Sequence, residues 1–342
     1  GSRTVTTEGL QKRKPTIRDV AAAAGVSRGT VSRVINGGHW VSPEARAAVE
    51  AAIESTGYYA NHHARSLATG RANSVAFLLT EPTQLLFDDP TFSILLRSAA
   101  EAAAKRHQTL VLLLAGTDEE RRHVARFVGA GHVDGVLLIS SHERDPMLET
   151  LISTGTPTVA CGIPLGHQDE VTPVSVDEIG SARVATRHLI EAGRSRIGMI
   201  AGPPDTPGGK YRLVGYREEM GDRYDQALVE AGDYSTASGA AAMERLLASA
   251  PDIDAVFAAS DRMAAGAIAT LRRHGRSVPG DVAVVGFDDS GLAERMDPPL
   301  TTMHQPFDEI AEQMVEQLDR IVGGRSGQSV TLPAPLVVRA TA

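Results

Sequence analysis

The chain has 342 residues, 42% of them hydrophobic and 22% charged, which are the values of a globular protein too long for one hydrophobic core. Its single cysteine, Cys161, excludes an internal disulfide framework. The net charge of −8 argues against nucleic-acid binding by the chain as a whole, but residues 1–70 carry a net +4 and the remainder −12. We therefore expect two or three domains, with a basic head attracted to phosphate and an acidic body.

Residues 1–14 begin with Gly-Ser instead of Met, as after cleavage of an expression tag, and we expect a disordered arm or tag remnant there. The chain contains no run of 18 apolar residues and no charged-then-apolar leader before Pro15. These features predict a cytoplasmic protein that does not interact with membranes, and the single cysteine fits the same reducing compartment.

Residues 15–59 predict a small domain of three helices. The first part has the pattern of two short helices joined by a tight turn, with capping or helix-ending residues at Thr16, Asp19, Gly25 and Ser27. The second helix turns Val31, Val34 and Ile35 inward and Arg28, Thr30 and Arg33 outward. Ser42-Pro43-Glu44 opens a third helix that ends at Gly57. The pattern predicts a helix-turn-helix whose cationic second helix fits a DNA major groove; the alternative is an αα-hairpin of an ordinary helical domain.

Residues 60–71 form a linker between this head and the body. Within it, the stretch 61–68 is long enough for two helical turns, but so short a helix does not persist in water without a partner. The partner would be DNA, a neighbouring subunit or both. Leu67, its one large apolar residue, is either an incidental exposed side chain or a wedge between base steps in the minor groove.

In residues 72–342, short apolar runs alternate with amphipathic helices. The runs expected as strands are Ser74–Thr80, Leu110–Leu114, Val136–Ser140, Thr158–Cys161, Ile197–Ala201, Ala255–Ala259 and Val282–Phe287. Expected helices include Phe92–Arg106, Glu119–Gly129, Ile179–Ala192, Ala240–Ala248, Arg262–His274 and Phe307–Val322. Continuous apolar strands are buried on both faces, so we predict an α/β body of doubly wound parallel sheets, long enough for two lobes. Ligands bind such sheets at the carboxyl ends of the strands.

Two local patterns imitate catalytic motifs without the context these motifs need. Residues 25–29 match the GxSxG nucleophile elbow, which requires a strand-to-helix turn, whereas they join two helices. Residues 202–210 resemble a phosphate-binding loop, but the first Gly is one position too far away and Tyr211 replaces the Ser or Thr that holds Mg²⁺. Cys161 lies in an apolar run that is typical of a small buried side chain. No metal-ligand spacing or acid–base pair stands out, so we expect no enzyme, no metal and no cofactor.

One family accounts for seven further stretches: TIRDVAAAAGVSRGTVSRVING, VSPEARAAVEAAIESTGY, NHHARSLATG, GMIAGP…YRLVGYRE, AVFAASDRMAAGAI, VAVVGFDD and DPPLTTMHQP. With these motifs the chain resembles the lactose-repressor/galactose-repressor (LacI/GalR) family of bacterial transcription regulators along nearly its whole length. The resemblance implies an all-α helix-turn-helix head, a hinge helix and a body like a periplasmic sugar-binding protein. It also implies three crossings between lobes, near Val176, Met303 and Gly324. Lobe 1 then comprises about residues 72–175 and 304–323, and lobe 2 about residues 176–303 and 324–342.

The resemblance assigns DNA-binding roles to positions in the head and linker. Arg28, Gly29 and Arg33 match base-reading positions, and arginine suits bidentate contacts with guanine O6 and N7. Gly29 departs from the family, since it has no side chain to read a base edge. The phosphate-contacting positions are matched by Ser27, Thr30, Asn36 and Ser42, with Thr16 and Asn61 as further DNA-facing candidates. Leu67 matches the minor-groove wedge, and His63 stands where the family usually has a small apolar residue.

The resemblance also implies an effector site. Arg212 matches an arginine that clamps effector hydroxyls or carboxylates, Asp288 matches an acid that accepts hydrogen bonds from sugar hydroxyls, and Phe92 matches an apolar or aromatic cleft residue. Further candidates are Ser260, Asp177 and Gln305. Each of the six has a structural alternative, as a helix cap or a bridge between lobes. An aspartate and an arginine suit polyhydroxyl ligands, so the expected effector is a mono- or oligosaccharide.

The resemblance implies a repressor that binds a palindromic operator as a homodimer and is released by a small effector. A dimer is favoured because the chain ends soon after residue 339, without the family's tetramer-forming tail. The effector would close the cleft between lobes, so that marginal hinge helices are no longer held together and unfold. Two alternatives stay open: a corepressor-dependent regulator of the purine type, and a solute-binding protein without DNA function, against which residues 1–70 argue.

Overall fold

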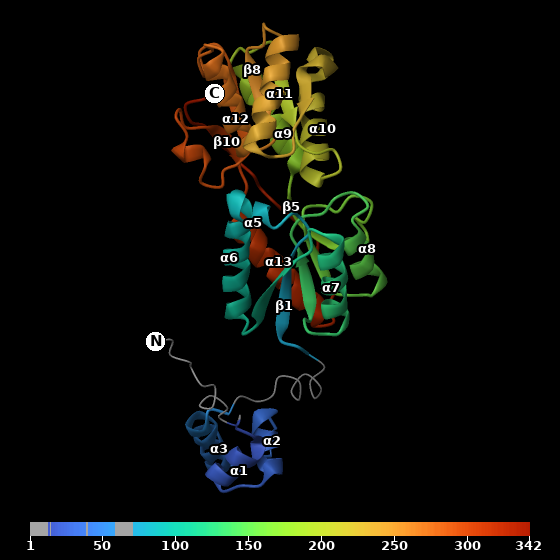
Figure 1. Cartoon of the computed structure of the whole chain (residues 1–342), viewed down its shortest axis with the longest axis vertical. Helices are drawn as coiled ribbons and strands as arrows, with labels where there is room; N and C mark the ends of the chain where they lie inside the picture. Colours follow the sequence, from blue (N-terminus) through green and yellow to red (C-terminus); the bar gives the residue numbers. More distant parts are fainter. Residues whose placement is uncertain (1–12, 14, 39, 59–70) are drawn as a thin grey trace, which may run out of the picture. The chain divides into compact units, whose positions relative to one another are not determined.

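The structure, a computed structural model, describes residues 13, 15–38, 40–58 and 71–342. The chain divides into two units, Gly1–Ala72 and Asn73–Ala342. Nearly all of the expected linker, including Asn61, His63 and Leu67, lies outside the described residues. Figure 1 shows the helices of the first unit and the two lobes of the second.

The described part of the head forms the helices α1 (Ile17–Ala24), α2 (Arg28–Ile35) and α3 (Pro43–Thr56). They enclose a small core of buried side chains: Val20, Ala21, Val31, Val34, Val49 and Ala52. Helix α1 ends at Gly25, whose φ of 66° is left-handed. Helices α2 and α3 begin at Ser27 and Ser42, whose side chains accept hydrogen bonds from the N–H groups of Thr30 and Ala45. The head is therefore a helix-turn-helix domain, with starts and stops where the sequence predicts them.

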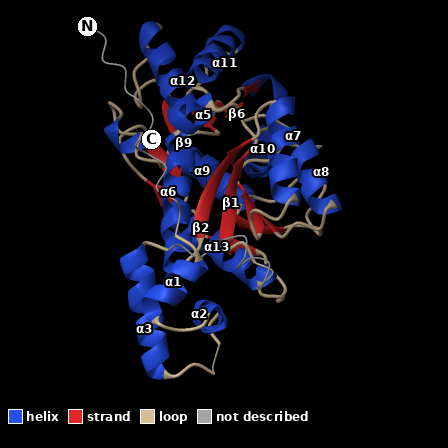
Figure 2. Cartoon of the chain, turned by 60° about the horizontal axis from the view of Figure 1, so that its bottom comes forward, coloured by secondary structure: helices blue, strands red, loops and turns tan. Residues whose placement is uncertain are grey.

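The first lobe is built on a six-stranded sheet in the order β11-β5-β4-β3-β1-β2, with all neighbours parallel. Its strands are β1 (Ser74–Leu79), β2 (Thr109–Leu114), β3 (Gly135–Leu138), β4 (Thr158–Cys161), β5 (Thr172–Val176) and β11 (Val330–Leu332). Helices α6 (Pro90–Lys105) and α13 (Phe307–Val322) cover one face, and α7 (Asp118–Gly129) and α8 (Pro146–Ser153) the other (Figure 2). A short helix, α5 (Gln84–Asp88), follows β1.

The second lobe repeats this plan in a sheet of order β12-β10-β9-β8-β6-β7, parallel except for β12. Its strands are β6 (Ile197–Ala201), β7 (Val229–Ala231), β8 (Ala255–Ala258), β9 (Ala283–Asp288), β10 (Thr301–His304) and β12 (Leu336–Val337). One face carries α9 (Glu178–Glu191) and α10 (Pro207–Met220), and the other α11 (Thr236–Ser249) and α12 (Asp261–Arg273). Three 3₁₀ turns span Gly221–Arg223, Gln226–Leu228 and Ala293–Arg295.

The fold class predicted from the sequence is confirmed: a helical head and a body of two doubly wound, mainly parallel sheets. The pattern behind the prediction is visible in β1, all six residues of which are buried. The motif-like residues 202–210 form the turn into α10, where Thr206 accepts a hydrogen bond from the N–H of Gly209 as a helix cap. This stretch therefore needs no phosphate to explain it.

The chain passes between the lobes three times, between β5 and α9, between β10 and α13, and between β11 and β12. The first two passages follow Val176 and His304, close to their expected places. The third crossing, expected near Gly324, is wrong, because Val330–Leu332 pairs with β5 of the first sheet. The crossing follows Leu332 instead. A three-residue edge strand is too short to show a period in the sequence.

Candidate DNA-binding face and effector cleft

The outward face of α2 is cationic. Arg28 and Arg33 are exposed, and neither forms an ion pair with another residue that the structure describes. Between them, Gly29 is exposed, and Thr30 is half-buried, with its hydroxyl 3.0 Å from that of Ser27. Two exposed guanidinium groups on a helix with a capped N-terminus suit insertion into a major groove.

The remaining head candidates lie at helix ends, as phosphate-contacting groups commonly do. Ser42 is exposed at the start of α3, and Asn36 is exposed at the end of α2, where its amide nitrogen is 3.4 Å from the Ser32 hydroxyl. At the start of α1, the Asp19 carboxylate accepts hydrogen bonds from both the N–H and the hydroxyl of Thr16, each 2.7 Å long. The Thr16 hydroxyl is thus occupied by Asp19 in this structure.

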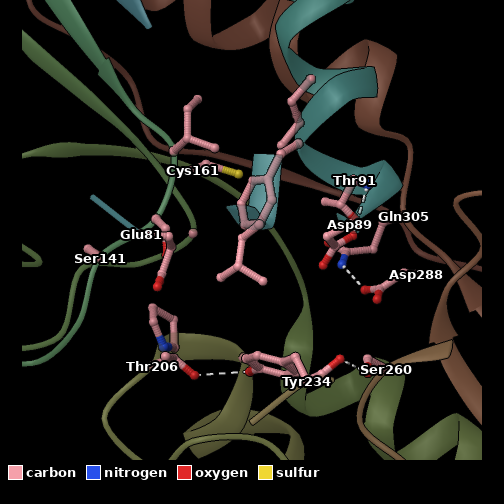
Figure 3. A pocket seen from close by; sticks show the side chains of 18 of the residues that line it. Glu81, Asp89, Thr91, Ser141, Cys161, Thr206, Tyr234, Ser260, Asp288 and Gln305 are labelled. Atoms are coloured by element: carbon pink, nitrogen blue, oxygen red, sulfur yellow. Dashed lines mark hydrogen bonds between the residues drawn. The ribbon is translucent and has the colours of Figure 1, made fainter. Parts of the chain in front are cut away.

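In the body, a cavity of about 500 Å³ lies between the two lobes. It collects residues that follow the parallel strands of both sheets, as expected for ligand sites of such sheets. Figure 3 shows Glu81, Ser141 and Cys161 of the first lobe on one side, with Tyr234 and Thr206 of the second lobe facing the cavity and Asp89, Gln305 and Asp288 on the opposite side. The volume of the cavity and its mixture of polar and apolar lining residues are typical of a small-molecule site.

Five of the six predicted effector residues line the cavity: Phe92, Arg212, Ser260, Asp288 and Gln305. Asp177 does not. It is exposed, and its side chain accepts a hydrogen bond of 2.9 Å from the N–H of Gly180 as the cap of α9. The next residue, Glu178, lines the cavity instead. The choice of Asp177 is therefore wrong by one position, and its structural alternative as a helix cap is the observed role.

Arg212 is buried, and most of its donors already bind protein acceptors. Its Nε and Nη2 donate to the Glu178 carboxylate at 2.7 and 3.3 Å, and its Nη1 donates to the carbonyl of Ala259 at 2.6 Å. Nη1 also lies 3.7 Å from an Asp288 oxygen. Burial alone would lower the pKa of Arg212, but Glu178 and Asp288 outweigh it and raise the pKa above its ordinary value. Arg212 therefore holds two cavity carboxylates in place.

Asp288 occupies a strained position at the end of β9. Its φ is 119°, which L-residues rarely adopt, and its Oδ1 accepts a hydrogen bond of 2.8 Å from Gln305. Burial raises the pKa of Asp288 well above its ordinary value, although Arg212 acts in the opposite direction. The strain aims a carboxyl group at the cavity, where it can accept hydrogen bonds from ligand hydroxyls.

Tyr234, which sequence reasoning missed, supplies a flat aromatic wall. It follows β7 with a positive φ of 70°, and its hydroxyl lies 3.0 Å from that of Thr206 (Figure 3). A Cβ added at Gly202 would come within 2.5 Å of the Tyr234 ring, so the glycine makes room for it. Burial raises the pKa of Tyr234 to about 12, which keeps the phenol neutral. The sequence offered no signal for it, because β7 has only three residues, none of them buried, and forms no apolar run.

Two polar atoms of the cavity residues are buried and have no hydrogen-bond partner among the residues that the structure describes: Ser141 Oγ and Arg262 Nη1. Arg262 reaches from the second lobe to Asp89 of the first, with 3.7 Å between Nη1 and Oδ2. Buried donors and acceptors without partners are rare in folded proteins. These atoms mark places where a ligand would complete the hydrogen bonding.

Cys161 also lines the cavity, and burial raises the pKa of its thiol to about 12. A thiol with so high a pKa is not a nucleophile at neutral pH. Among the described residues, no group of three or more His, Cys, Asp or Glu side chains is arranged to hold a metal ion. The cavity lining offers a ligand carboxylates, guanidinium groups, hydroxyls and aromatic rings.

Comparison with known proteins decides the family. Residues 16–61 match the bacterial regulatory proteins of the lacI family, and residues 186–342 match a periplasmic binding protein-like domain. The HTH-type transcriptional regulator CelR of Thermobifida fusca is 46% identical over 318 residues, which cover 92% of this chain and 94% of CelR. The chain belongs to the LacI family of bacterial regulatory proteins. The ribose operon repressor of Escherichia coli (strain K12) is 36% identical to this LacI-family regulator over 310 residues, or 89% of this chain and 92% of that protein.

Solved structures agree with this assignment. A CelR–cellobiose complex aligns with a TM-score of 0.77 at 43% identity, covering 96% of this LacI-family regulator and all (100%) of that chain. A lac repressor dimer bound to operator and the anti-inducer ONPF aligns with a TM-score of 0.83 at 26% identity, covering 96% and 99% of the two chains. The resemblance inferred from the sequence motifs is confirmed, and the relatives are transcriptional regulators. In the described ranges, no helix combines the length and apolar character needed to cross a membrane.

Proposed function

We propose that this LacI-family regulator is a transcriptional repressor that binds operator DNA through α2 as a homodimer and is released by a disaccharide bound between its lobes. The observation that carries the proposal is that one chain contains both a helix with two exposed arginines and a cavity lined by several acids. The first feature suits DNA and the second suits a polyhydroxyl ligand. The protein would act in the cytoplasm and catalyse no reaction.

The effector class follows from the size and the polarity of the cavity. Carboxylates accept hydrogen bonds from hydroxyls, and the cavity contains five acids: Glu81, Asp89, Glu178, Asp233 and Asp288. Tyr234 offers an aromatic face to a sugar ring, and about 500 Å³ falls within the range of cavities that enclose drug-sized ligands, a class that includes disaccharides. CelR, the relative with a cellobiose complex, supports cellobiose as the probe of choice. A purine corepressor is not favoured, since a nucleobase offers few hydroxyls to these acids.

The proposed homodimer is supported by the edge of the first sheet. Strand β2 is the outermost strand, and its sequence TLVLLL is apolar after the first residue. None of its six residues is fully buried, and Leu112 is 39% exposed. An apolar edge strand left open invites pairing with another chain, and a second copy of this protein would cover it.

The function is tested with DNA selected from a random duplex pool by the full-length protein. We expect a near-palindromic consensus whose affinity falls steeply with salt, and release of that DNA by cellobiose but not by maltose at the same concentration. Fluorescence anisotropy of the labelled duplex measures both effects. Recovery of no consensus would refute the DNA-binding part, whereas a consensus that cellobiose leaves bound would refute the effector.

Replacing Arg262 by Met tests the cross-cleft contact with the effector. A ligand hydroxyl can accept a hydrogen bond from Arg262 and donate one to Asp89, which a carboxylate ligand cannot do. Loss of a hydrogen bond to a charged group costs about 1.5–3 kcal/mol, so cellobiose affinity should fall between about tenfold and a hundredfold in calorimetric titration. Arg223→Met, on an exposed 3₁₀ turn of the same lobe, is the matched control. Equal affinities of the two variants would remove Arg262 from the site.

Leu67→Ala tests the proposed wedge in the linker, which lies outside the described residues. We expect weaker operator binding with nearly unchanged cellobiose affinity, because an intercalating side chain acts on the bent DNA and not on the cleft. Gel-shift titration measures the first quantity and calorimetry the second. Operator affinity equal to that of the unaltered protein would defeat the assignment.

A further inference from the structure

A histidine connects the two lobes at the wall of the cavity. His142, in the loop after β3 of the first lobe, has its Nε2 2.7 Å from Oε1 of Glu81, which follows β1 in the same lobe. Its Nδ1 lies 2.8 Å from Oδ2 of Asp205, which follows β6 in the second lobe. Beside this contact, the backbone N–H of Glu143 donates to the carbonyl of Asp205 at 2.6 Å. These contacts join the two lobes. The residues that make them lie in the loops after three different strands, β1, β3 and β6.

The geometry itself requires a protonated imidazole. Ionised carboxylates only accept hydrogen bonds, and both ring nitrogens of His142 face a carboxylate oxygen. A neutral imidazole has one donor, so its second nitrogen would meet a carboxylate lone pair. An imidazolium donates from both nitrogens and is attracted by both charges.

We propose that Glu81, His142 and Asp205 form an interlobe clasp that holds the cleft closed and so sets the affinity for the effector. Closure brings Asp205 to a His142–Glu81 pair that already exists within the first lobe. The clasp therefore raises the population of the closed state even when no ligand is bound. This inference depends on the proposed function only in the second test below, in which cellobiose is the ligand.

The clasp makes closure depend on protonation. The titratable groups that act on His142 are Glu81 and Asp205; their hydrogen bonds and charges, that of Glu81 first, raise the pKa of His142 to about 9 against the opposing effect of burial. An open cleft would separate Asp205 from His142, and losing this carboxylate would lower the pKa of His142. A group whose pKa is raised by closure stabilises the closed state fully below its open-state pKa and loses this effect as the pH rises through about 9.

Hydrogen bonds hold the Glu81 carboxylate in place and favour its charged form. Burial alone would raise its pKa, but hydrogen bonds from His142 and from the Ser140 hydroxyl, the latter 2.6 Å long, lower it below the ordinary value. Its side chain is 16% exposed, against 35% for His142 and 49% for Asp205. The half-exposed Asp205 contact is screened by water, so the expected effect is about tenfold and not larger.

The first test needs no ligand. In the full-length protein with ¹³C-labelled histidine, the imidazole signal that disappears in His142→Gln identifies His142, and its titration gives the pKa. We expect a value near 9 in the unaltered protein and a value lower by about one in Asp205→Asn, which removes the charge and keeps the size. Asp222→Asn, an exposed acid of the same lobe, should change nothing. A pKa near the ordinary 6.5 in the unaltered protein, or one that Asp205→Asn leaves unchanged, would overturn the clasp.

The second test uses cellobiose. Asp205 is not among the cavity-lining residues, so its replacement changes closure without removing a ligand contact. We expect Asp205→Asn to weaken cellobiose binding by about tenfold at pH 7 and to flatten its dependence on pH between about 7 and 10, whereas the unaltered protein loses affinity over that range. Unchanged affinity and an unchanged pH profile would overturn the clasp. If cellobiose fails to bind the unaltered protein while the titration behaves as expected, the clasp stands and the effector assignment falls.

Discussion

Replacing Arg212 by Ala is expected to lower the free energy of unfolding of the body by about 3–5 kcal/mol and to abolish the response to cellobiose. The reason is that the guanidinium neutralises buried acids. Arg212 is 6% exposed and donates twice to Glu178, while Asp288 lies 3.7 Å away. Removing it leaves Glu178 as an uncompensated buried charge, which costs more than the lost hydrogen bonds.

Unfolding of the body can be followed by circular dichroism, because most of the helical residues lie in the body. The single tryptophan, Trp40, lies in the head and is 90% exposed, so its emission is already that of a solvated indole and does not respond to unfolding of the body. Urea unfolding of Arg212→Ala should show an early transition by circular dichroism without a matching change in fluorescence. A body as stable as that of the unaltered protein would contradict the role of Arg212.

A double variant separates stability from ligand contact. Arg212→Met with Glu178→Gln removes both members of the buried pair, and replacing a whole pair by neutral groups is often close to neutral for stability. Asp288 can take up a proton at little cost, since burial already raises its pKa. We expect the double variant to regain most of the stability but not the response to cellobiose. Recovery of that response would show that the arginine acts only on the fold.

The contrast between Arg212 and His142 explains why the sequence predicted one and missed the other. Arg212 lies in a motif, YRLVGYRE, that the family resemblance covers, so a pattern pointed to it. Glu81, His142 and Asp205 lie 61 and 63 residues apart along the chain, in loops with no periodicity. They meet because each follows a parallel strand, and the carboxyl ends of both sheets face the cleft. Because β1, β3 and β6 are predictable from their apolar runs, the rule points to the loops that carry all three residues.

The error at Asp177 has a different cause. Asp177 and Glu178 are consecutive acids at the start of a helix, and either can serve as its cap. In this fold the shorter side chain, that of Asp177, caps α9, and the longer one, that of Glu178, reaches Arg212. The hydrophobic periodicity of the sequence does not show which of the two acids caps the helix, because that depends on how the start of α9 lies in the cleft. Seven strands, by contrast, lie within about two residues of their expected bounds, since each is an apolar run of its own. The buried strands β5 and β10 were missed, because threonine, serine, proline and histidine interrupt their apolar residues.

The largest effect on DNA is expected from replacing Arg28 and Arg33 together by Ala. Both are exposed on α2, and neither has an ion-pair partner in the described part of the chain, so their removal should leave the stability of the head unchanged. A bidentate arginine–guanine contact is worth about 1–3 kcal/mol of discrimination, and the two add because the residues act on separate bases. The sum is about 2–6 kcal/mol, so operator affinity should fall between about thirtyfold and twenty-five-thousandfold.

The same measurement distinguishes base reading from simple attraction to phosphate. If Arg28 and Arg33 read bases, the variant loses far more affinity for the selected operator than for a random duplex; phosphate contacts would reduce both equally and flatten the salt dependence. Arg18→Ala, an exposed arginine of α1, is the matched control for charge. Gly29→Ser extends the test, since an added Cβ would meet only the Ser27 hydroxyl, at 3.6 Å. A changed consensus for that variant would place this face of α2 against base edges.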